Sequence, residues 1–350
     1  MSGTPEPSSP HRRRPRYRGK NPRHFAEKYK ERDPAGHAAT IAKVLAAGKT
    51  PAGTHRPIMV DEILEVLAPQ PGEIAVDCTL GYGGHAEALL ARLRPGGRLL
   101  GLDADPIELP KTEARLRSLG HGPEAFSAQR TNFAGLPRAL ARAGVDGADC
   151  ILVDLGVSSM QLDDPARGFS AKADAPLDLR MNPERGQPAA RFLEKIEADR
   201  LVRLLQENAD ETQAAILGPA LAGKLFPSTG SLGRAIRGMM PQADKAAVDL
   251  SMRRVLQALR IAVNDEFSAL ETLLRHLPSC LRSGGRVAIL TFHSGEDRRI
   301  KKAFAAGRRD GSYARIAEEV LRPSAAERHR NPRSSSAKLR WALRGGAETK

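Results

Sequence analysis

The stretch Val76-Asp-Cys-Thr-Leu-Gly-Tyr-Gly-Gly-His85 constrains the fold of this chain more than any other segment. Its pattern predicts a short buried strand that ends in an acid and runs into a glycine-rich turn. A helical pattern follows over residues 86–93, and a second strand pattern over residues 98–103 ends in another acid, Asp103. Because glycines let a backbone turn tightly beside a ligand, this order predicts a nucleotide-like pocket at the edge of a parallel sheet.

Two cofactors fit this pocket on the local pattern. The spacing Gly81-x-Gly83-x-x-Ala86, with Asp103 about 20 residues further on, satisfies a permissive fingerprint for NAD. S-adenosylmethionine requires the same order of strand, glycine loop, strand and acid, without a pyrophosphate to hold. In both cases the Asp103 carboxylate can accept hydrogen bonds from the ribose hydroxyls. The glycine loop alone leaves both cofactors open.

Composition excludes several classes of protein. The 350 residues are 41% hydrophobic, which supports a real core. No apolar run approaches the ~18 residues that a membrane span needs, and the first residues lack the apolar segment of a secretory signal, so we expect a cytoplasmic protein without a membrane partner. Three single cysteines, Cys78, Cys150 and Cys280, form no C-x-x-C pair. We therefore expect them in the core, with no disulfide framework and no metal site.

Positive charge is concentrated at the two ends of the chain. The net charge is +14. Residues 1–33 carry ten Lys/Arg and four Asp/Glu, and residues 298–350 carry fifteen and five, which leaves the middle slightly negative. A nearly neutral body with two basic ends is typical of a protein that binds a polyanion, and nucleic acid is the commonest one in the cytoplasm. Solubilising tails are the alternative.

Strand and helix patterns alternate from residue 58 onward, which predicts a parallel sheet covered on both faces. The predicted strands are 74–79, 98–103, 125–130, 148–154 and 285–292, followed by two antiparallel strands over 313–322 and 337–344. The long gap before the fifth strand is rich in amphipathic helix, as at 198–205 and 252–274. We therefore predict a basic arm over 1–50, a main domain over 51–165 and 277–350, and an inserted helical substrate-recognition subdomain over 166–276.

Longer blocks resemble a known family. They are Val76–His85, Asp154-Leu-Gly-Val-Ser-Ser-Met-Gln-Leu-Asp-Asp164, Arg167-Gly-Phe-Ser170, Leu177–Met181, Gln257–Glu266 and Phe292-His-Ser-Gly-Glu-Asp-Arg298. In order and spacing, from about His55 to Arg344, these blocks resemble the RsmH (MraW) family of S-adenosylmethionine-dependent 16S rRNA cytosine-N4 methyltransferases. The resemblance favours S-adenosylmethionine over NAD. It implies a class I, Rossmann-like methyltransferase sheet and action on the small ribosomal subunit, at the decoding-centre cytidine conventionally numbered 1402; a homodimer is left open.

The resemblance also implies a set of site residues. The cofactor-binding residues are Gly83, Gly84, His85, Asp103, Phe133, Asp154 and Gln161. Phe133 can cover the adenine face, and carboxylates favour the cationic sulfonium and ammonium groups of the cofactor. Asp154 is also the expected catalytic residue, as the acceptor of an N4 hydrogen, with His293 and Glu296 as alternatives. Arginines that could contact phosphates are Arg167, Arg180, Arg253, Arg254 and Arg260.

The chain departs from the family pattern at a few positions. Before Gln257 the family usually has a His-Pro-x-Thr-Arg-Thr-Phe run, which is absent from residues 248–256. Ala86 replaces a serine, Gly295 replaces a leucine, and the basic arm lies outside the resemblance. Two alternatives follow: a divergent methyltransferase of another RNA cytidine, and a non-catalytic ribosome-assembly factor that keeps the fold.

Overall fold

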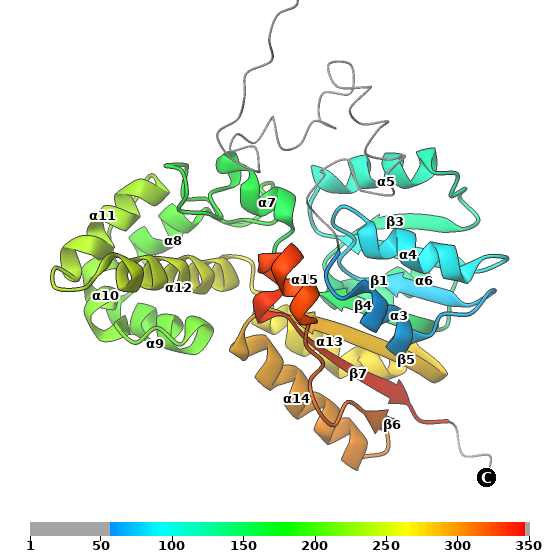
Figure 1. The fold of residues 1–350 in the computed structure, drawn as a ribbon. Helices are drawn as coiled ribbons and strands as arrows, with labels where there is room; N and C mark the ends of the chain where they lie inside the picture. Colours follow the sequence, from blue (N-terminus) through cyan, green and yellow to red (C-terminus); the bar gives the residue numbers. More distant parts are fainter. Residues whose placement is uncertain (1–56, 347–350) are drawn as a thin grey trace, which may run out of the picture. The chain divides into compact units, whose positions relative to one another are not determined.

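A seven-stranded sheet forms the centre of the molecule in a computed structural model that describes residues 57–346 (Figure 1). The predicted arm over residues 1–50 lies outside the described residues. The strand order is β3-β2-β1-β4-β5-β7-β6. The strands are β1 (Ile74–Asp77), β2 (Arg98–Asp103), β3 (Phe126–Arg130), β4 (Ala148–Asp154), β5 (Leu281–Thr291), β6 (Tyr313–Ile316) and β7 (Lys338–Arg344).

Strand directions agree with the sequence prediction. Strands β1 to β5 run parallel, whereas β7 is antiparallel to β5 and β6 is antiparallel to β7. The predicted class I, Rossmann-like sheet is confirmed, including its two final antiparallel strands. The order reverses between β1 and β4, so the carboxyl ends of these two strands flank the crevice where such sheets bind ligands. Asp77 and Asp154 end these strands.

Both faces of the sheet are buried because neighbouring residues of each strand point to opposite sides. Val76 and Ile151 lie in one core and Ala75 and Leu152 in the other. The first core includes residues of α6 (Leu136–Arg142), α13 (Glu266–Cys280) and α14 (Ser294–Arg309). The second includes residues of α3 (Val60–Leu67), α4 (Gly84–Leu93) and α5 (Glu108–Ser118). This two-sided burial explains the continuous apolar runs in the sequence.

A third core belongs to the helices between β4 and α13. These are α7 (Ser159–Asp163), η3 (Pro165–Arg167), α8 (Ala189–Lys195), α9 (Ala198–Ala209), α10 (Ala214–Leu221), α11 (Thr229–Met239) and α12 (Lys245–Val263). Their buried side chains, from Phe169 to Leu259, pack together apart from the sheet. The buried leucines of α13 instead lie in the sheet core. We therefore place the end of the insertion at Val263, earlier than the sequence-based division at residue 276, and the rest of that division stays a prediction.

The amphipathic stretch predicted over 252–274 belongs to two successive helices. Helix α12 ends at Val263 and α13 begins at Glu266. Asp265 between them has φ +51°, a left-handed conformation that no helix continues through. The apolar periodicity runs across this break because each helix has an inner face, one toward the insertion core and one toward the sheet.

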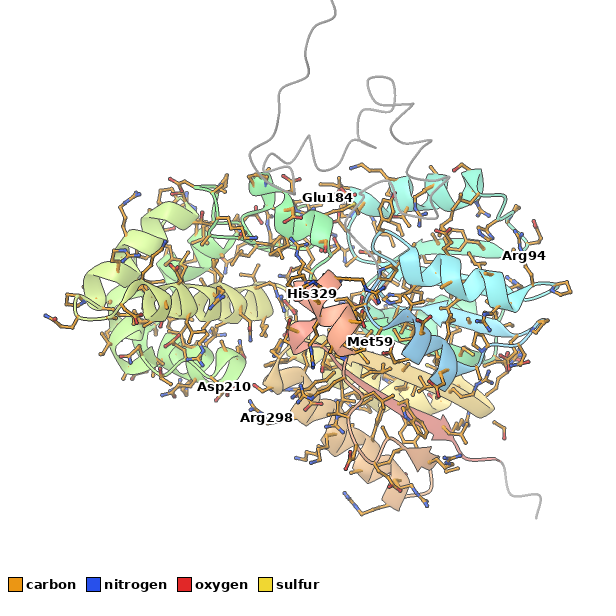
Figure 2. The ribbon with its side chains drawn as sticks, viewed as in Figure 1. Met59, Arg94, Glu184, Asp210, Arg298 and His329 are labelled. Atoms are coloured by element: carbon orange, nitrogen blue, oxygen red, sulfur yellow. The ribbon has the colours of Figure 1, made fainter. Side chains whose placement is uncertain are left out.

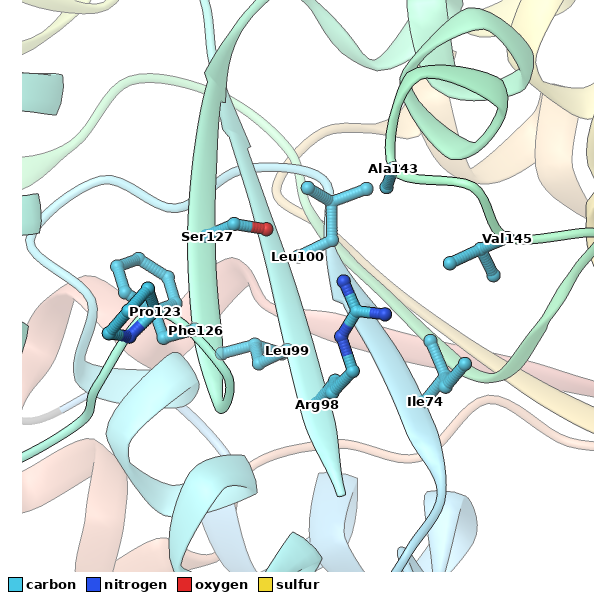
Figure 3. Close-up of a pocket in the computed structure, with 9 residues that line it drawn as sticks. All are labelled: Ile74, Arg98, Leu99, Leu100, Pro123, Phe126, Ser127, Ala143 and Val145. Carbon is cyan, nitrogen blue, oxygen red and sulfur yellow. The ribbon is translucent and has the colours of Figure 1, made fainter. Parts of the chain in front are cut away.

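A small cavity lies where β1 and β2 begin, at the end of the sheet opposite the glycine loop (Figure 3). Its lining residues are Ile74, Arg98, Leu99, Leu100, Pro123, Phe126, Ser127, Ala143 and Val145. The lining is mostly aliphatic and contains no carboxylate. This cavity is therefore separate from the strand ends at which the predicted site residues lie.

The three cysteines are free and buried, as predicted. Among residues 57–346, no helix combines the length and apolar character needed to cross a membrane, and no cluster of His, Cys, Asp and Glu side chains has the arrangement of a metal site.

Candidate active site

The glycine loop begins where β1 ends and leads directly into α4. Gly83 has φ +80° and caps the helix, a conformation that favours glycine. A Cβ on Gly83 would lie 2.9 Å from Thr112 Cγ2, and one on Gly84 would lie 2.4 Å from Pro57 Cγ. Close packing therefore favours glycine at both positions, and a positive φ also favours it at Gly83. The loop presents its backbone at the carboxyl edge of the sheet.

Asp103 holds the glycine loop in place at the end of β2. Its Oδ2 accepts a hydrogen bond from Gly81 N at 2.7 Å, and its Oδ1 accepts one from Asp105 N at 2.9 Å. Burial raises the pKa of Asp103 to about 6 despite these two donors. Each carboxylate oxygen keeps a second lone pair, so a ribose diol can still be bound here.

His85 lies between two acids that end neighbouring strands. Its Nε2 is 2.9 Å from Ile58 O. Because a carbonyl only accepts, Nε2 carries the proton and Nδ1 is the acceptor in the neutral ring. Burial lowers the pKa of His85, against the attraction of Asp77. Burial also raises the pKa of Asp77, which is 1% exposed, to about 6.

Asp154 is the acid with the most perturbed environment in this group. Its Oδ2 lies 3.7 Å from His85 Nδ1, and its Oδ1 is buried with no hydrogen-bond partner. Its backbone N donates to Thr79 Oγ1 at 2.6 Å, which fixes the end of β4 against the glycine loop. Burial, with the Glu296 carboxylate nearby, raises the pKa of Asp154 to about 7. An unpartnered buried acceptor costs stability, which is typical of a position that awaits a donor.

The turn after β5 supplies a second acid beside Asp154. Glu296 Oε2 accepts a hydrogen bond from Phe292 N at 2.9 Å, and Glu296 Oε1 lies 3.0 Å from His293 Nε2, off the line of a hydrogen bond. Burial alone would raise the pKa of Glu296, but His293, Arg260 and the Phe292 N–H together lower it. Glu296 is therefore a fixed negative charge that holds its own loop.

The glycine at position 295 has a local structural reason. A Cβ on Gly295 would lie 2.7 Å from Phe267 Cζ and 3.2 Å from His293 Nδ1. The Phe267 ring packs against His293, with ring centroids 5.8 Å apart. The Arg299 guanidinium also lies over the Phe267 ring, with its Cζ 3.6 Å from the ring centroid. Phe267 thus fills the space that a side chain at 295 would need, and this departure from the family pattern leaves no gap.

Gln161 belongs to a polar network centred on Asp105. Its Oε1 accepts from Ser158 N in a capping box at the start of α7, and its Nε2 donates to Asp105 Oδ2 at 2.7 Å. Arg167 Nη1 donates to the same oxygen at 2.8 Å, and its Nη2 donates to the carbonyls of Arg180 and Met181. Asp105 is 1% exposed. This network joins the end of β2 to α7 and to the loop that opens the insertion.

Phe133, the predicted adenine contact, begins the short helix η2 (Phe133–Gly135) after β3. Its ring is partly buried and packs against the sheet core, and η2 contacts α13. The chain therefore places Phe133 on the β3 side of the strand ends, with part of the ring accessible. Its cofactor contact stays a prediction.

Polar contacts connect the insertion to the main domain at separate points. Asn264 Oδ1 accepts from Met181 N at 2.7 Å, and its Nδ2 donates to Leu179 O at 2.7 Å. On another side Asp210, at the end of α9, pairs with Arg298 at 3.2 Å (Figure 2). The first contact is half-buried and holds the loop before α8, whereas the second is exposed and adds little stability.

Three of the five arginines suggested as phosphate contacts are used inside the chain. Arg167 pairs with Asp105, and Arg180 and Arg260 make two-pronged pairs with Asp178 and Glu266. Such bidentate pairs occupy the guanidinium. The phosphate contacts of these three arginines stay a prediction, in which an RNA phosphate would compete with an internal carboxylate.

Two residues of the site were missed as candidates. Asp77 ends β1 in the same way that Asp103 and Asp154 end their strands, so its position was a usable signal. Asp105 carries no such signal, because it follows a strand end by two residues and has the composition of a surface turn. Only the fold reveals that it is the centre of a buried network.

The strand-end acids and the glycine loop together form one site, and its residues fit the predicted cofactor. The turn of Gly83 and Gly84 presents its backbone at the strand ends, and the buried Asp154 Oδ1 has no hydrogen-bond partner. Three carboxyl groups with raised pKa values, on Asp77, Asp103 and Asp154, suit a cofactor with two positive charges. This agrees with S-adenosylmethionine, and no pyrophosphate is needed.

A comparison with family models gives a match to the MraW methylase family over residues 52–344. The chain belongs to the MraW methylase family. The sequence-based recognition is therefore confirmed. A methylase family built on a class I sheet uses S-adenosylmethionine as its methyl donor, so the cofactor prediction is confirmed over NAD.

Curated relatives are similar to almost the whole chain. Ribosomal RNA small subunit methyltransferase H 1 of Lachnoclostridium phytofermentans is 48% identical over 343 residues, covering 95% of this chain and 93% of the relative. Ribosomal RNA small subunit methyltransferase H 2 of Alkaliphilus metalliredigens is 47% identical, covering 95% and 97%. These relatives are named as methyltransferases of small-subunit ribosomal RNA.

The sequence alignments with these two relatives extend into the basic arm. Residues 51–350 are 300 of the 350 residues, so a coverage of 95% requires that part of the first 50 is aligned. The relative from Symbiobacterium thermophilum, at 38% identity, covers 85% of this chain. The expectation that the arm lies outside the resemblance is therefore wrong for the H 1 and H 2 relatives.

Solved structures of methyltransferases and of fibrillarin match the chain with lower similarity. The SAM-dependent O-methyltransferase of Thermotoga maritima has a TM-score of 0.38 at 10% identity, covering 83% of this chain and 66% of that one. Fibrillarin of Aeropyrum pernix, with natively bound S-adenosyl-L-methionine, has a TM-score of 0.35 at 10% identity, covering 78% and 67%.

Proposed function

We propose that the protein transfers a methyl group from S-adenosylmethionine to the N4 amine of a cytidine in 16S rRNA, by family resemblance the decoding-centre cytidine 1402. Membership of the MraW methylase family and the names of the relatives support methylation of small-subunit ribosomal RNA. The nucleotide and the acceptor nitrogen are the finer part of the proposal.

The observation that carries the proposal is the unsatisfied hydrogen-bonding capacity of the Asp154 carboxyl group. Its Oδ1 is buried without a partner, at the end of the central strand β4, and its Oδ2 lies 3.7 Å from His85 Nδ1 at the start of α4. An exocyclic amine has N–H donors that such an oxygen can accept. A hydroxyl acceptor, as in ribose methylation, would instead need a group that removes its proton before or during transfer.

Methyl transfer to the cytosine N4 depends more on the geometry of the reacting groups than on a strong base. The lone pair of the cytosine N4 is delocalised into the ring, so the amine is a poor nucleophile. An acceptor that holds one N4 hydrogen turns the lone pair toward the methyl group, about 3 Å away and in line with the sulfur. The bond from N4 to the methyl carbon forms as the bond from carbon to sulfur breaks, and N4 then releases a proton. Asp154 can accept this proton directly.

The remaining site residues bind and orient the cofactor in this proposal. The backbone of Gly83 and Gly84 would lie along the methionine part, and His85 lies beside Asp154, with its Nδ1 3.7 Å from Asp154 Oδ2. Asp103 would accept from the ribose, and Phe133 would cover the adenine. Gln161 aligns α7 through its capping box and its bond to Asp105. The sulfonium supplies the electrophilic methyl group when the cofactor is bound.

Protonation of Asp154 would depend on the cofactor. With a pKa of about 7, a substantial fraction of the free protein carries a neutral Asp154 at neutral pH. Two cationic groups nearby favour the carboxylate, so cofactor binding lowers the pKa and releases a proton. Binding of S-adenosylmethionine should therefore weaken as the pH falls from 8 to 5.

Mapping the methyl group tests the proposal. Labelled S-adenosylmethionine is incubated with the protein and with small subunits isolated from cells that lack this enzyme, and the label is located by nuclease digestion and mass spectrometry. Label on N4-methylcytidine at one position supports the proposal. Label on another base or on ribose refutes it, and a protein that binds the subunit without transferring label would be an assembly factor.

Because residues 248–256 differ from the usual family run, the alternative target is another RNA cytidine. The same mapping experiment identifies it, since a second cytidine would give N4-methylcytidine at a different nucleotide.

A further inference from the structure

A short basic segment, residues 324–336, lies beside the candidate active site. It contains α15 (Ala325–Arg330) and η4 (Pro332–Ser336) and precedes β7. Ser324 caps α15 by accepting from Glu327 N at 3.1 Å, and Leu321 bridges to Leu339 of β7. The segment is therefore an ordered part of the main domain rather than an extension of the C-terminus.

Two side chains attach this segment to both walls of the site. Glu327 Oε1 accepts from Met59 N at 2.8 Å, and Met59 follows Ile58, whose carbonyl accepts from His85. Arg333 Nη2 donates to Asp163 Oδ1 at 2.6 Å, at the end of the helix that carries Gln161. Figure 1 shows α15 between α7 and α3, and Figure 2 shows His329 near Met59.

The outward side chains of this segment have surplus positive charge. Arg328, His329 and Arg330 are exposed in the last turn of α15. Among the described residues, neither Arg328 nor Arg330 is paired with a carboxylate. The two anchoring residues, Glu327 and Arg333, are already engaged. The simple alternative is that these cations only complement the carboxyl end of a helix, which is worth a few tenths of a kcal/mol on a short exposed helix.

We propose that Arg328 and Arg330 bind backbone phosphates of the RNA strand that delivers the target base to Asp154. This rests on the proposed function, because it takes RNA as the substrate. Guanidinium groups match the geometry of phosphate oxygens. The two residues are two positions apart on a helix, so they point to different sides and hold two separate phosphates. A substrate strand passing over α15 would then be fixed beside the crevice between β1 and β4.

The test compares two double variants of the full-length protein with the same change of charge. The first is Arg328→Ala with Arg330→Ala. The control is Arg308→Ala with Arg309→Ala, two exposed arginines at the far end of α14, ~18 Å along the helix from Glu296. Binding of unmodified small subunits is measured at several KCl concentrations, and binding of S-adenosylmethionine is measured separately.

We expect the α15 variant to bind the subunit about tenfold more weakly at ~0.1 M salt, with a slope of log Kd against log salt that is lower by about 1.4–1.8. The control should change affinity by less than about twofold, and both variants should bind S-adenosylmethionine normally. Arg328→Lys with Arg330→Lys should restore most of the slope. An unchanged slope in the α15 variant, or equal losses in both double variants, would overturn the inference.

This readout is separate from the identity of the methylated atom. If label were found on a base other than cytosine while the α15 variant still lost affinity, the proposed N4 chemistry would fall and this inference would stand. If N4-methylcytidine were formed and the α15 variant bound normally, only this inference would fall.

Discussion

Replacing Asp154 by asparagine tests the proposed site through stability as well as activity. Asp154→Asn keeps the size of the side chain but removes its charge. In the protein, burial raises the pKa of Asp154 from 3.8 to about 7. A carboxyl group whose pKa is higher in the folded than in the unfolded state destabilises the fold as the pH rises from about 4 to about 7.

The size of this destabilisation follows from the pKa shift of Asp154 and from the exposed fraction of its side chain. A shift of about 3 units corresponds to a ceiling of about 4 kcal/mol above pH 7, at 1.36 kcal/mol per unit. The side chain is 29% exposed, so solvent screening reduces this to about 2 kcal/mol. An asparagine amide left unpartnered at the same place costs about 1 kcal/mol. The variant should therefore gain about 1 kcal/mol at pH 8.

At pH 4.5 the sign of the difference should reverse. There the carboxyl group is protonated in the folded protein, and the charge penalty falls to about a quarter of its value at pH 8. The unpartnered amide then makes the variant slightly less stable than the parent. Urea unfolding at both pH values, without cofactor, measures the free energies. Asp146→Asn is the matched control, because Asp146 is exposed and precedes the same strand; it should change stability by less than about 0.5 kcal/mol at either pH.

Methyl transfer by the same variant should fall by about a hundredfold or more, because an asparagine amide accepts an N–H less strongly than a carboxylate. A variant that gains stability at pH 8 and loses activity supports both the buried charge and its role. Activity within about threefold of the parent would remove Asp154 from the proposed chemistry, and a stability difference that does not change with pH would refute the electrostatic argument.

Other perturbations test the rest of the site. Asp105→Asn should destabilise the protein by about 3 kcal/mol, because it leaves the buried Arg167 without its carboxylate, whereas Glu184→Gln in an exposed pair should cost less than about 1 kcal/mol in the same urea assay. Gly83→Ala and Gly72→Ala both place alanine at a φ near +80°, but only the alanine at position 83 would meet neighbouring side chains. Calorimetry should therefore show about tenfold weaker binding of S-adenosylmethionine for Gly83→Ala and unchanged binding for Gly72→Ala. Calorimetry in buffers of different ionisation enthalpy should show protons released on cofactor binding between pH 6 and 7, from the three carboxyl groups with raised pKa values; uptake of protons would contradict that assignment.

The parallel sheet could be predicted because its signals are local. Each of the strands ending at Asp77, Asp103 and Asp154 is a short apolar run followed by an acid, and such runs are typical of strands buried on both faces. The amphipathic stretch predicted over 252–274 is helical, and one left-handed residue, Asp265, divides its apolar periodicity between two helices.

The site could be predicted only where a residue ends a strand or forms a recognisable block. The role of Asp105 and the pairing of Arg167 depend on side chains that meet across 62 positions of sequence. No periodicity encodes such a contact. Cysteines and glycines were easier to interpret from the sequence. The burial of Cys78 and the close packing at Gly84 follow from the strand and the turn beside which they lie.

The bond between Arg167 and Asp105 limits how this protein can be altered. Arg167 lies at the start of the insertion, yet its guanidinium is held by an acid at the tip of β2 and by carbonyls of its own loop. A graft that moved residues 166–263 onto another methyltransferase would bring a buried cation without its anion, unless the recipient also had an acid at that tip. The helical insertion is therefore not an exchangeable module. Any change of RNA specificity by recombination would have to transfer Arg167 and Asp105 together.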